Sequence, residues 1–334
     1  MSTPHIWIVS PASARANNGN WQSASRWARF LRTRYRVSIS QQWPESGKHL
    51  GEQSPPDLLI ALHARRSAPS LDAYARACPQ RPSILLLTGT DLYRDIQTDA
   101  NAQQALRQAS ALVLLQAAGM DALPAPQRAK ASVIFQSATT LKPAAPANKR
   151  HRDVVMVGHL RSEKDPLTFM RAAALVTAPK ARLVHIGGAL EPALEQAALA
   201  TAAAHPRYRW LGALPHAATR QRLKRSHLMA IASQMEGGAN VIIEAVCSGV
   251  PVLASDISGN RGMLGDDYAG YFPAGDAAAL ARLIDRALAE PDFYTLLRAQ
   301  CDARLPLFSP ASEQAALLEL VDNLLHKAKQ GMTK

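Results

Sequence analysis

Two glutamates flank a pair of glycines in the segment MEGGANVIIEAV, residues 235–246. On one continuous helix, Glu236 and Glu244 would lie about 80° apart around the axis and roughly 12 Å apart along it, too far to share a small ligand. If Gly237 and Gly238 form a tight loop instead, a helix can begin just after them. Glu236 then precedes the helix and Glu244 lies about one turn inside it, so both acids approach whatever binds the helix N-terminus.

The start of such a helix is suited to a ligand that carries phosphate. Its first N–H groups have no partner inside the helix, and the helix dipole places partial positive charge there. A carboxylate beside a phosphate is repelled, so Glu236 and Glu244 should meet neutral hydroxyl groups. A nucleotide sugar, with a central diphosphate and hydroxylated rings on each side, satisfies both demands. The residues alone leave open an ordinary α/β unit with a glycine turn and a solvated glutamate.

The elements around this segment follow a regular rhythm, in which short apolar runs alternate with longer helix-like stretches. The strand-like runs are residues 6–10, 57–63, 83–89, 110–116 and 132–136, and then 153–160, 181–188, 208–212, 227–233 and 250–256. This alternation is typical of parallel α/β sheets. Between the two series, residues 140–152 are rich in Pro, Ala and charge and predict a linker.

We therefore predict an α/β fold of two Rossmann-like, doubly wound domains, with ligands at the carboxyl ends of the strands and a cleft between the domains. Neither domain carries G-x-G-x-x-G after a strand, and no G-x-x-x-x-G-K-[ST] motif occurs, which disfavours a nicotinamide enzyme and a P-loop ATPase. Asp266 and Asp267 lie in a loop-like stretch and form no convincing metal pair. We expect neither a cofactor nor a metal ion.

The composition fits a packed globular protein. Of the 334 residues, 47% are apolar and 19% charged, and no run of 18 apolar residues or signal-peptide pattern is present. The three cysteines are widely spaced and suggest neither disulfides nor a zinc site. We expect a cytoplasmic protein, with His185 and Cys247 in the core.

The net charge of +12 is concentrated in the first half of the chain. Residues 1–150 contain 18 Lys and Arg against 8 Asp and Glu, a net of +10, which leaves 20 against 18, a net of +2, for residues 151–334. This bias favours an anionic partner, which could be a phosphorylated small molecule, an acidic membrane surface or a nucleic acid.

The segment EGGANVIIEAVCSGVPVLAS, residues 236–255, resembles the E-x7-E region of glycosyltransferase family 4, whose members are retaining enzymes of GT-B architecture. The likeness continues through DISGNRGMLGDDYAGYFPAGD. It implies that Glu236 contacts the donor sugar and Glu244 the ribose. It also implies that the diphosphate meets the loop amides. The donor-binding loop residues it implies are Gly237, Gly238, Ala239, Asn240 and Val241.

A second block of the same family, G-R-L-x-x-x-K, is matched by GHLRSEK, residues 158–164. Lys164 corresponds to the lysine that binds phosphate in the family. His159 replaces the usual arginine, so either Arg161 supplies the missing charge or the leaving group is less strongly stabilised. The resemblance implies an N-terminal domain of residues 1–145, a C-terminal donor domain of 150–306, and a last helix, 307–334, that returns to the first domain.

The first half is similar to the selenosugar synthases of selenoneine biosynthesis, and this likeness covers nearly the whole chain. It is carried by residues 10–31, 59–71, 87–96 and 133–138. In that family a nucleotide sugar donates its glycosyl group to the selenium of selenophosphate. The resemblance implies a UDP-sugar donor, either UDP-N-acetylglucosamine or UDP-glucose, and a 1-selenosugar product.

A multiply charged anionic acceptor would explain the excess of positive charge in the first half of the chain, since arginine binds such anions well. The acceptor-binding candidates, expected in loops at strand ends although each could be a solvated surface residue, are Arg15, Arg65, Arg66, Thr90 and Arg94.

Two further residues of the first half are implied near the reacting groups. His63 follows a strand where family members carry a histidine near the donor sugar, and Asp91 lies in a turn that faces the acceptor, although it could equally cap the following helix. Both should position groups rather than remove protons, because selenophosphate is already a strong nucleophile. Gly19 and Asn20 correspond to a loop that approaches the donor phosphates.

Three other functions remain open from the sequence. A membrane-associated transferase with a lipid or hydroxyl acceptor is suggested by the aromatic, arginine-rich segment 21–36, although a helix packed on its own sheet explains it too. A non-enzymatic nucleic-acid binder is suggested only by the isoelectric point of about 10.0. A nucleotide-sugar epimerase would share the architecture. We expect no nucleic-acid partner and no membrane association.

Overall fold

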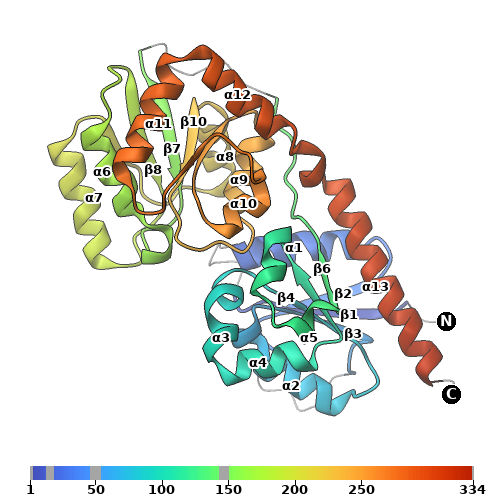
Figure 1. Cartoon of the computed structure of the whole chain (residues 1–334). Coiled ribbons are helices and arrows are strands. Elements are labelled where there is room, and N and C mark those ends of the chain that lie inside the picture. The colour runs from blue at the N-terminus through green and yellow to red at the C-terminus, as the bar shows by residue number, and fades with distance from the viewer. Residues whose placement is uncertain (1–2, 13–18, 46–53, 143–149, 333–334) are drawn as a thin grey trace. The chain divides into compact units, whose positions relative to one another are not determined.

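The computed structural model shows two compact units, each built on a parallel six-stranded sheet (Figure 1). Unit 1 consists of residues 1–136 and 310–334, and unit 2 of residues 137–309. The residues that the structure describes are 3–12, 19–45, 54–142 and 150–332.

The sheet of unit 1 has the order β2-β1-β3-β4-β5-β6. Its strands are β1 (His5–Val9), β2 (Arg36–Ser40), β3 (Leu58–Leu62), β4 (Ser83–Leu86), β5 (Ala111–Leu114) and β6 (Ala131–Val133). Strands β1, β3, β4 and β5 are buried at every residue. Helices on both faces of a parallel sheet require such continuous apolar runs.

Two apolar clusters, one on each face of this sheet, hold the helices of unit 1. Helices α1 and α13 pack on one face, and α2 and α4 on the other. The helical elements are α1 (Gly19–Leu31), α2 (Ala64–Ala77), the π-helical turn η2 (Asp91–Asp95), α3 (Ile96–Thr98), α4 (Ala100–Gln108), the 3₁₀ helix η3 (Ala117–Ala122), α5 (Ala125–Arg128) and α13 (Pro310–Met332).

The last helix, α13, belongs to unit 1 because its buried face packs against α1. Val321 lies in the same apolar cluster as Trp27. Glu313 is 1% exposed and accepts hydrogen bonds from Arg26 Nε and Trp27 Nε1, each at 2.9 Å. The apolar side of segment 21–36 is therefore buried within the protein, which accounts for its aromatic residues without a membrane.

The sheet of unit 2 has the order β12-β11-β10-β7-β8-β9. Its strands are β7 (Arg152–Val157), β8 (Ala181–Ile186), β9 (Tyr208–Trp210), β10 (Leu228–Ile231), β11 (Val252–Ser255) and β12 (Tyr271–Phe272). Its helical elements are the 3₁₀ helix η4 (Ser162–Lys164), α6 (Pro166–Leu175), α7 (Pro192–Ala204), α8 (His216–Lys224), α9 (Asn240–Val246), α10 (Ser258–Leu264), α11 (Ala277–Ala289), α12 (Pro291–Asp302) and the 3₁₀ helix η5 (Leu305–Phe308).

The chain passes into unit 2 at residue 137, earlier than the linker expected at 140–152. The reason is local hydrogen bonding. The Leu141 N–H donates to the Cys247 carbonyl at 2.9 Å, and Arg220 Nη2 donates to the Thr139 carbonyl at 2.9 Å. Residues at the beginning of the predicted linker are thus bound to unit 2, and residues 143–149 lie outside the described part.

Each predicted strand overlaps an observed one, but two strands at sheet edges were not predicted. Strand β2 is largely half-buried and lacks a continuous apolar run, and β12 has only two residues. Neither carries the pattern by which buried strands are found. The helix expected over 21–36 accordingly ends at Leu31, and β2 begins at Arg36.

Some site residues expected in loops lie in helices. Arg65 and Arg66 are in the first turn of α2, because β3 passes into this helix through His63 alone. Arg94 lies in the π-helical turn η2, and Gly19 and Asn20 form the beginning of α1. The connection from β3 to α2 in particular is shorter than the sequence suggested.

Candidate functional site

The predicted site residues of unit 2 follow the carboxyl ends of β7 and β10, which are neighbours in the sheet. Lys164 ends the 3₁₀ helix η4 after β7, and Glu236 follows β10. Because parallel strands bring their carboxyl ends to one edge, these residues meet although they are 72 positions apart. Lys164 Nζ donates a hydrogen bond to Glu236 Oε1 and forms an ion pair with it.

The carboxylate of Glu236 is also held by a serine. Ser233 Oγ donates to Glu236 Oε1 at 2.6 Å, and Glu236 is only 8% exposed. A buried carboxylate needs such compensation, here from one cation and one hydroxyl. Sequence reasoning missed Ser233, and the available signal was its position at a strand end three residues before Glu236. A backbone hydrogen bond of 2.9 Å from Gln234 N–H to the Glu163 carbonyl joins the two strand-end loops.

Helix α10 packs closely against the backbone of Glu236. Gly259 lies so close that a Cβ atom there would be 2.0 Å from the Glu236 carbonyl oxygen and 2.9 Å from its carbon. No side chain fits at such distances without a backbone shift. The position of Glu236 therefore depends on a glycine 23 residues later in the sequence.

The predicted helix after the Gly-Gly pair is α9, with Ala239 as its N-cap residue. Glu236 precedes it and Glu244 lies one turn inside it, as expected. Within the described residues, the backbone amides from Gly238 to Val241 donate no hydrogen bond. These amides are available as donors at the edge where Lys164 and Glu236 meet.

Glu244 has a partner that sequence reasoning did not find. His216 Nε2 lies 2.6 Å from Glu244 Oε1, and the side chain of Glu244 is 13% exposed while that of His216 is 45% exposed. His216 is the first residue of α8, 28 positions before Glu244, and no motif marks it. The imidazole of His216 therefore contacts the carboxylate of Glu244, which was expected to bind the ribose hydroxyls.

His159 occupies the position where the resembling family has an arginine. Its Nδ1 accepts the Gly188 N–H at 3.1 Å. Burial, followed by the nearby Arg161 charge, lowers the pKa of His159 below its ordinary value, so the ring is neutral near pH 7. With Nδ1 accepting, the proton is on Nε2. His159 therefore offers an N–H donor without a charge, and the cations of this block are Arg161 and Lys164.

His185 and Cys247 were expected in the core, and both are buried. His185 is 0% exposed, its Nε2 lies 3.1 Å from the Gly158 carbonyl oxygen, and its Nδ1 lies 3.1 Å from the Tyr208 hydroxyl. Burial lowers the pKa of His185 to about 4. The ring is thus neutral in the folded protein at pH 7.

The buried neutral ring of His185 makes the folding stability of the protein depend on pH. Between about pH 6.5 and pH 4 the unfolded chain binds a proton at this residue that the folded chain does not, so stability falls as the pH falls. The loss reaches about 3 kcal/mol near pH 4. Urea unfolding across this range should show a shallower decline for His185→Gln. The exposed His151→Gln should retain the wild-type decline, and equal slopes for all three proteins would contradict the assignment.

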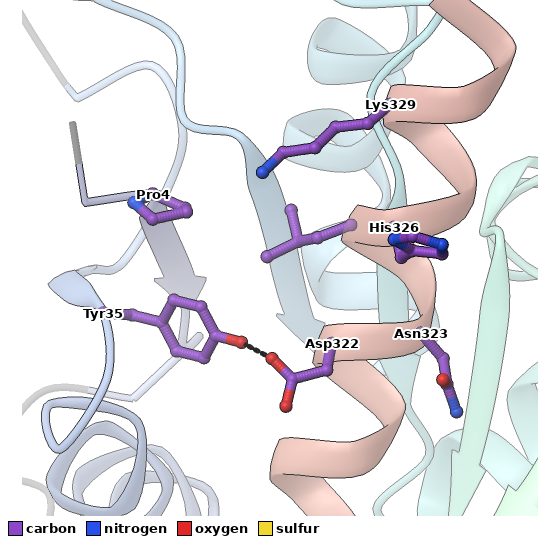
Figure 2. A pocket seen from close by; sticks show the side chains of 7 residues that line it. Pro4, Tyr35, Asp322, Asn323, His326 and Lys329 are labelled. Atoms are coloured by element: carbon purple, nitrogen blue, oxygen red, sulfur yellow. Dashed lines mark hydrogen bonds between the residues drawn. The ribbon is translucent and has the colours of Figure 1, made fainter. Parts of the chain in front are cut away.

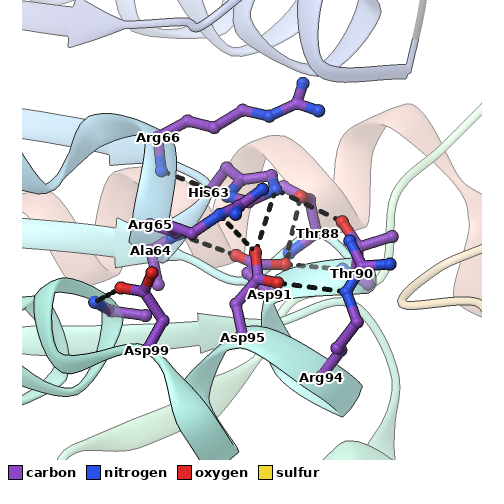
Figure 3. A network of polar contacts seen from close by, with 12 residues as sticks. His63, Ala64, Arg65, Arg66, Thr88, Thr90, Asp91, Arg94, Asp95 and Asp99 are labelled. Atoms are coloured by element: carbon purple, nitrogen blue, oxygen red, sulfur yellow. Dashed lines mark hydrogen bonds and ion pairs between the residues drawn. The ribbon is translucent and has the colours of Figure 1, made fainter.

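In unit 1 the predicted residues follow the neighbouring strands β3 and β4 (Figure 3). His63 has a φ of 72°, a left-handed conformation that strains any residue other than glycine. Its Nδ1 accepts the Arg66 N–H at 3.4 Å, and its Nε2 lies 3.2 Å from Thr90 Oγ1. Burial lowers the pKa of His63, more than the nearby Asp91 charge raises it. The neutral ring then carries its proton on Nε2 and donates to Thr90.

Asp91 is fully buried, and its carboxylate accepts hydrogen bonds from backbone N–H groups that follow β3 and β4. Its Oδ1 accepts the N–H groups of Thr88 and Gly89 at 2.8 and 2.9 Å, and its Oδ2 accepts the Ala64 N–H at 2.8 Å. It therefore fixes the turn after β4 and the start of α2, next to His63. This geometry suits a positioning role.

The predicted arginines of unit 1 are divided between two environments. Arg65 and Arg94 both contact Asp95, which sequence reasoning missed although it directly follows Arg94. Arg66 is exposed, and its guanidinium points away from Asp95 (Figure 3). Arg15 lies outside the described residues.

A separate pocket of about 400 Å³ opens beside α13 (Figure 2). Its lining includes Pro4 and Tyr35, which immediately precede β1 and β2, so it lies at the amino ends of these strands. The other lining residues are Asp322, Asn323, Leu325, His326 and Lys329. None is a predicted site residue, because those residues gather at the carboxyl edges of the sheets.

Within residues 3–12, 19–45, 54–142 and 150–332, no three His, Cys, Asp or Glu side chains are grouped as a metal site requires. In the same part of the chain, no helix is both long and apolar enough to cross a membrane.

Comparison with known proteins places this chain among sugar transferases. The family model for "Glycosyl transferases group 1" matches residues 137–303. The structure of Anabaena Alr3699/HepE with UDP and glucose has a TM-score of 0.77 at 18% identity, covering 96% of this chain and 100% of that one. Sucrose-phosphate synthase from Thermosynechococcus elongatus has a TM-score of 0.76 at 16% identity, covering 98% and 100%. No curated protein sequence matches.

Likeness to solved structures at such low identity establishes the fold alone. It agrees with the two parallel sheets described above and confirms the predicted GT-B architecture with two Rossmann-like units.

Proposed function

Because the chain belongs to the family of group 1 glycosyl transferases, we propose that it moves a sugar from a UDP-sugar to the selenium of selenophosphate. The C1–O bond of the donor breaks and a C1–Se bond forms, which releases UDP. Water then cleaves the P–Se bond, so the products are a 1-selenosugar and phosphate. We assign this reaction to selenoneine biosynthesis, with UDP-N-acetylglucosamine or UDP-glucose as the donor.

The observation that carries the donor half is the Lys164–Glu236 pair beside the amides that precede α9. A departing UDP gathers negative charge on its β-phosphate, and fixed donors aimed at that charge stabilise it. Lys164 and the amides of 238–241 supply such donors, with Arg161 as a further cation. Glu236 and Glu244 then accept hydrogen bonds from sugar and ribose hydroxyls. Solved relatives of this fold bind UDP and glucose or UDP-glucose, which supports this donor class.

The acceptor half is supported by the cations that follow β3 and β4. Arg65, Arg66 and Arg94 bring three positive charges to one sheet edge beside His63 and Thr90. An inorganic trianion needs several such charges, whereas a sugar hydroxyl needs none. Arg15 remains a further candidate, and Gly19 and Asn20 remain candidates for the donor phosphates.

Proton transfer is a minor part of the proposed reaction. Selenophosphate is already anionic at selenium, so it attacks C1 without losing a proton to the protein. His63 donates a hydrogen bond from Nε2, and Asp91 holds the turn that carries Thr90. We assign both as positioning groups, because an acceptor that is already anionic needs no general base.

One experiment tests the reaction class. The protein is incubated with UDP-N-acetylglucosamine or UDP-glucose, with and without selenophosphate, and the products are identified by mass. We expect a selenium isotope pattern on a hexose only when both substrates are present. A thiophosphate arm and an alcohol arm serve as alternative acceptors. UDP release that is independent of selenophosphate, or a product without selenium, would contradict the proposal.

A further inference from the structure

Asp95 is a buried carboxylate that the proposed reaction does not use. It is 4% exposed and ends the π-helical turn η2. The oxygens of Asp91 accept backbone N–H groups, whereas those of Asp95 meet two side-chain cations (Figure 3). Arg94 Nε donates to Asp95 Oδ1 at 3.2 Å, and Arg65 Nε lies 3.1 Å from Oδ2.

The two arginines approach Asp95 from different elements. Arg65 belongs to the first turn of α2, and Arg94 belongs to η2, 29 residues later. Their side chains are 44% and 49% exposed, while that of Asp95 is 4% exposed. Both of these contacts are made through Nε, at the base of the guanidinium. The buried carboxylate thus anchors two cations that reach the surface.

Without a shared anion, Arg65 and Arg94 would repel each other and sample many rotamers. A long, flexible side chain that must be ordered when ligand binds weakens binding, and an anchored one does not incur that loss. Asp95 Oδ2 accepts no hydrogen bond from the described residues and lies 3.9 Å from His63 Nε2. The negative charge of Asp95 therefore attracts both arginines and lies close to Nε2 of His63.

We propose that Asp95 is a positioning residue for the anionic acceptor: it aligns Arg65 and Arg94 so that both guanidinium groups meet the same phosphate-like group. This inference rests on the proposed function, because it concerns the acceptor of that reaction. Asp95 would then strengthen the binding of a negatively charged substrate, although it is itself negatively charged, because it aligns the two arginines.

Whether Asp95→Asn raises or lowers the acceptor KM distinguishes a positioning role of Asp95 from a purely electrostatic one. If Asp95 only added negative charge near the acceptor, then Asp95→Asn would make the site more positive and lower the acceptor KM. If Asp95 aligns the arginines, the same substitution releases one or both of them and raises the acceptor KM. The isosteric amide preserves the volume of the buried side chain, so packing changes little.

The test is steady-state kinetics of the full chain with selenophosphate as the varied substrate. Asp95→Asn should raise the acceptor KM about tenfold, as expected when a charge-assisted hydrogen bond is weakened. The donor KM and kcat should stay within about twofold. The matched control is Asp72→Asn, which removes a carboxylate from the exposed Asp72–Arg76 pair on α2 and should leave every constant unchanged. An acceptor KM that is unchanged or lower in Asp95→Asn would overturn the inference.

A double-mutant cycle protects the test against a general loss of stability. In the Arg65→Ala/Arg94→Ala background Asp95 has no cation left to align, so Asp95→Asn should no longer raise the acceptor KM. The same increase in that background would show that Asp95 acts through something else, and would overturn the inference.

Binding of inorganic phosphate, measured by titration calorimetry at constant ionic strength, separates this inference from the proposed function. If the wild-type protein makes no selenosugar but binds phosphate more tightly than Asp95→Asn does, the proposed function fails and the inference stands. If selenosugar forms with an acceptor KM indifferent to Asp95, the function stands and the inference fails. If the protein neither makes selenosugar nor binds phosphate, both fail.

Discussion

Replacing Lys164 with methionine is expected to lower kcat for UDP release by about 10²- to 10³-fold, the usual loss when one fixed donor to a developing oxyanion is removed. Lys164 is the cation paired with Glu236 at the carboxyl edge of the unit 2 sheet. Methionine keeps an unbranched side chain, one atom shorter than that of lysine, but it cannot stabilise charge on the departing diphosphate. Initial rates with saturating donor and acceptor measure the effect.

The same substitution should also destabilise the fold, because Glu236 is then left as a nearly buried anion whose remaining side-chain partner, among the residues that the structure describes, is Ser233. Breaking a buried pair in this way costs about 3–5 kcal/mol. In the double variant Lys164→Met/Glu236→Gln the unpaired charge is gone, so stability should recover while activity stays low. Recovery of both would show that Lys164 serves the fold rather than the chemistry.

A matched control for Lys164 lies at the other edge of the same sheet. Arg182 binds Asp153 through two hydrogen bonds of 2.7 and 2.9 Å near the amino ends of β8 and β7, and both side chains are mostly buried. Arg182→Met removes a cation from a similar environment away from the carboxyl edge. It should lower the free energy of unfolding and leave kcat unchanged.

Gly259→Ala is expected to lower kcat/KM by about 10²-fold or more, because it displaces Glu236 without altering its chemistry. A Cβ at position 259 would lie 2.0 Å from the Glu236 carbonyl oxygen. Inside a helix, alanine is more stable than glycine by about 1 kcal/mol. Gly259 is the second residue of α10 and gains less than this, so the overlap with a backbone atom, which costs about 1–3 kcal/mol, decides the sign for stability.

The control for this steric prediction is Gly158→Ala, whose Cβ would lie 3.5 Å from Lys164 Cγ, an ordinary van der Waals distance. It introduces the same methyl group beside the other member of the pair without overlap. We expect its activity to stay within a few-fold of the wild type. Kinetics and urea unfolding of both variants, measured side by side, check the prediction. Equal activities of Gly259→Ala and the wild type would contradict it.

Much of the fold follows from local sequence patterns. Strands β1, β3, β4 and β5 are buried along their whole length, so the sequence had to supply continuous apolar runs that are visible without any structure. The start of α9 was predictable for a similar reason, because Gly237 and Gly238 interrupt the strand pattern before an apolar, helix-like stretch. These features depend on residues that are near one another in the chain.

The edges of the sheets and the lengths of connections were less predictable. Strand β2 is half-buried, so its side chains need not be apolar, and pairing with β1 rather than its own composition makes it a strand. The carboxylate of Asp91 accepts the Ala64 N–H and thereby stabilises a helix that begins immediately after His63. A local pattern carries no information about a partner 27 residues away.

Local patterns in the sequence were thus enough for the two series of alternating strands and helices, the glycine loop before α9, and the residue types suited to a nucleotide sugar and an anion. Which side chains meet follows from the folded sheets: Lys164 with Glu236, His216 with Glu244, and Arg65 and Arg94 with Asp95. The physical reason is that parallel strands gather their carboxyl ends at one edge, so chemistry there depends on the order of strands in the sheet rather than on distance along the chain.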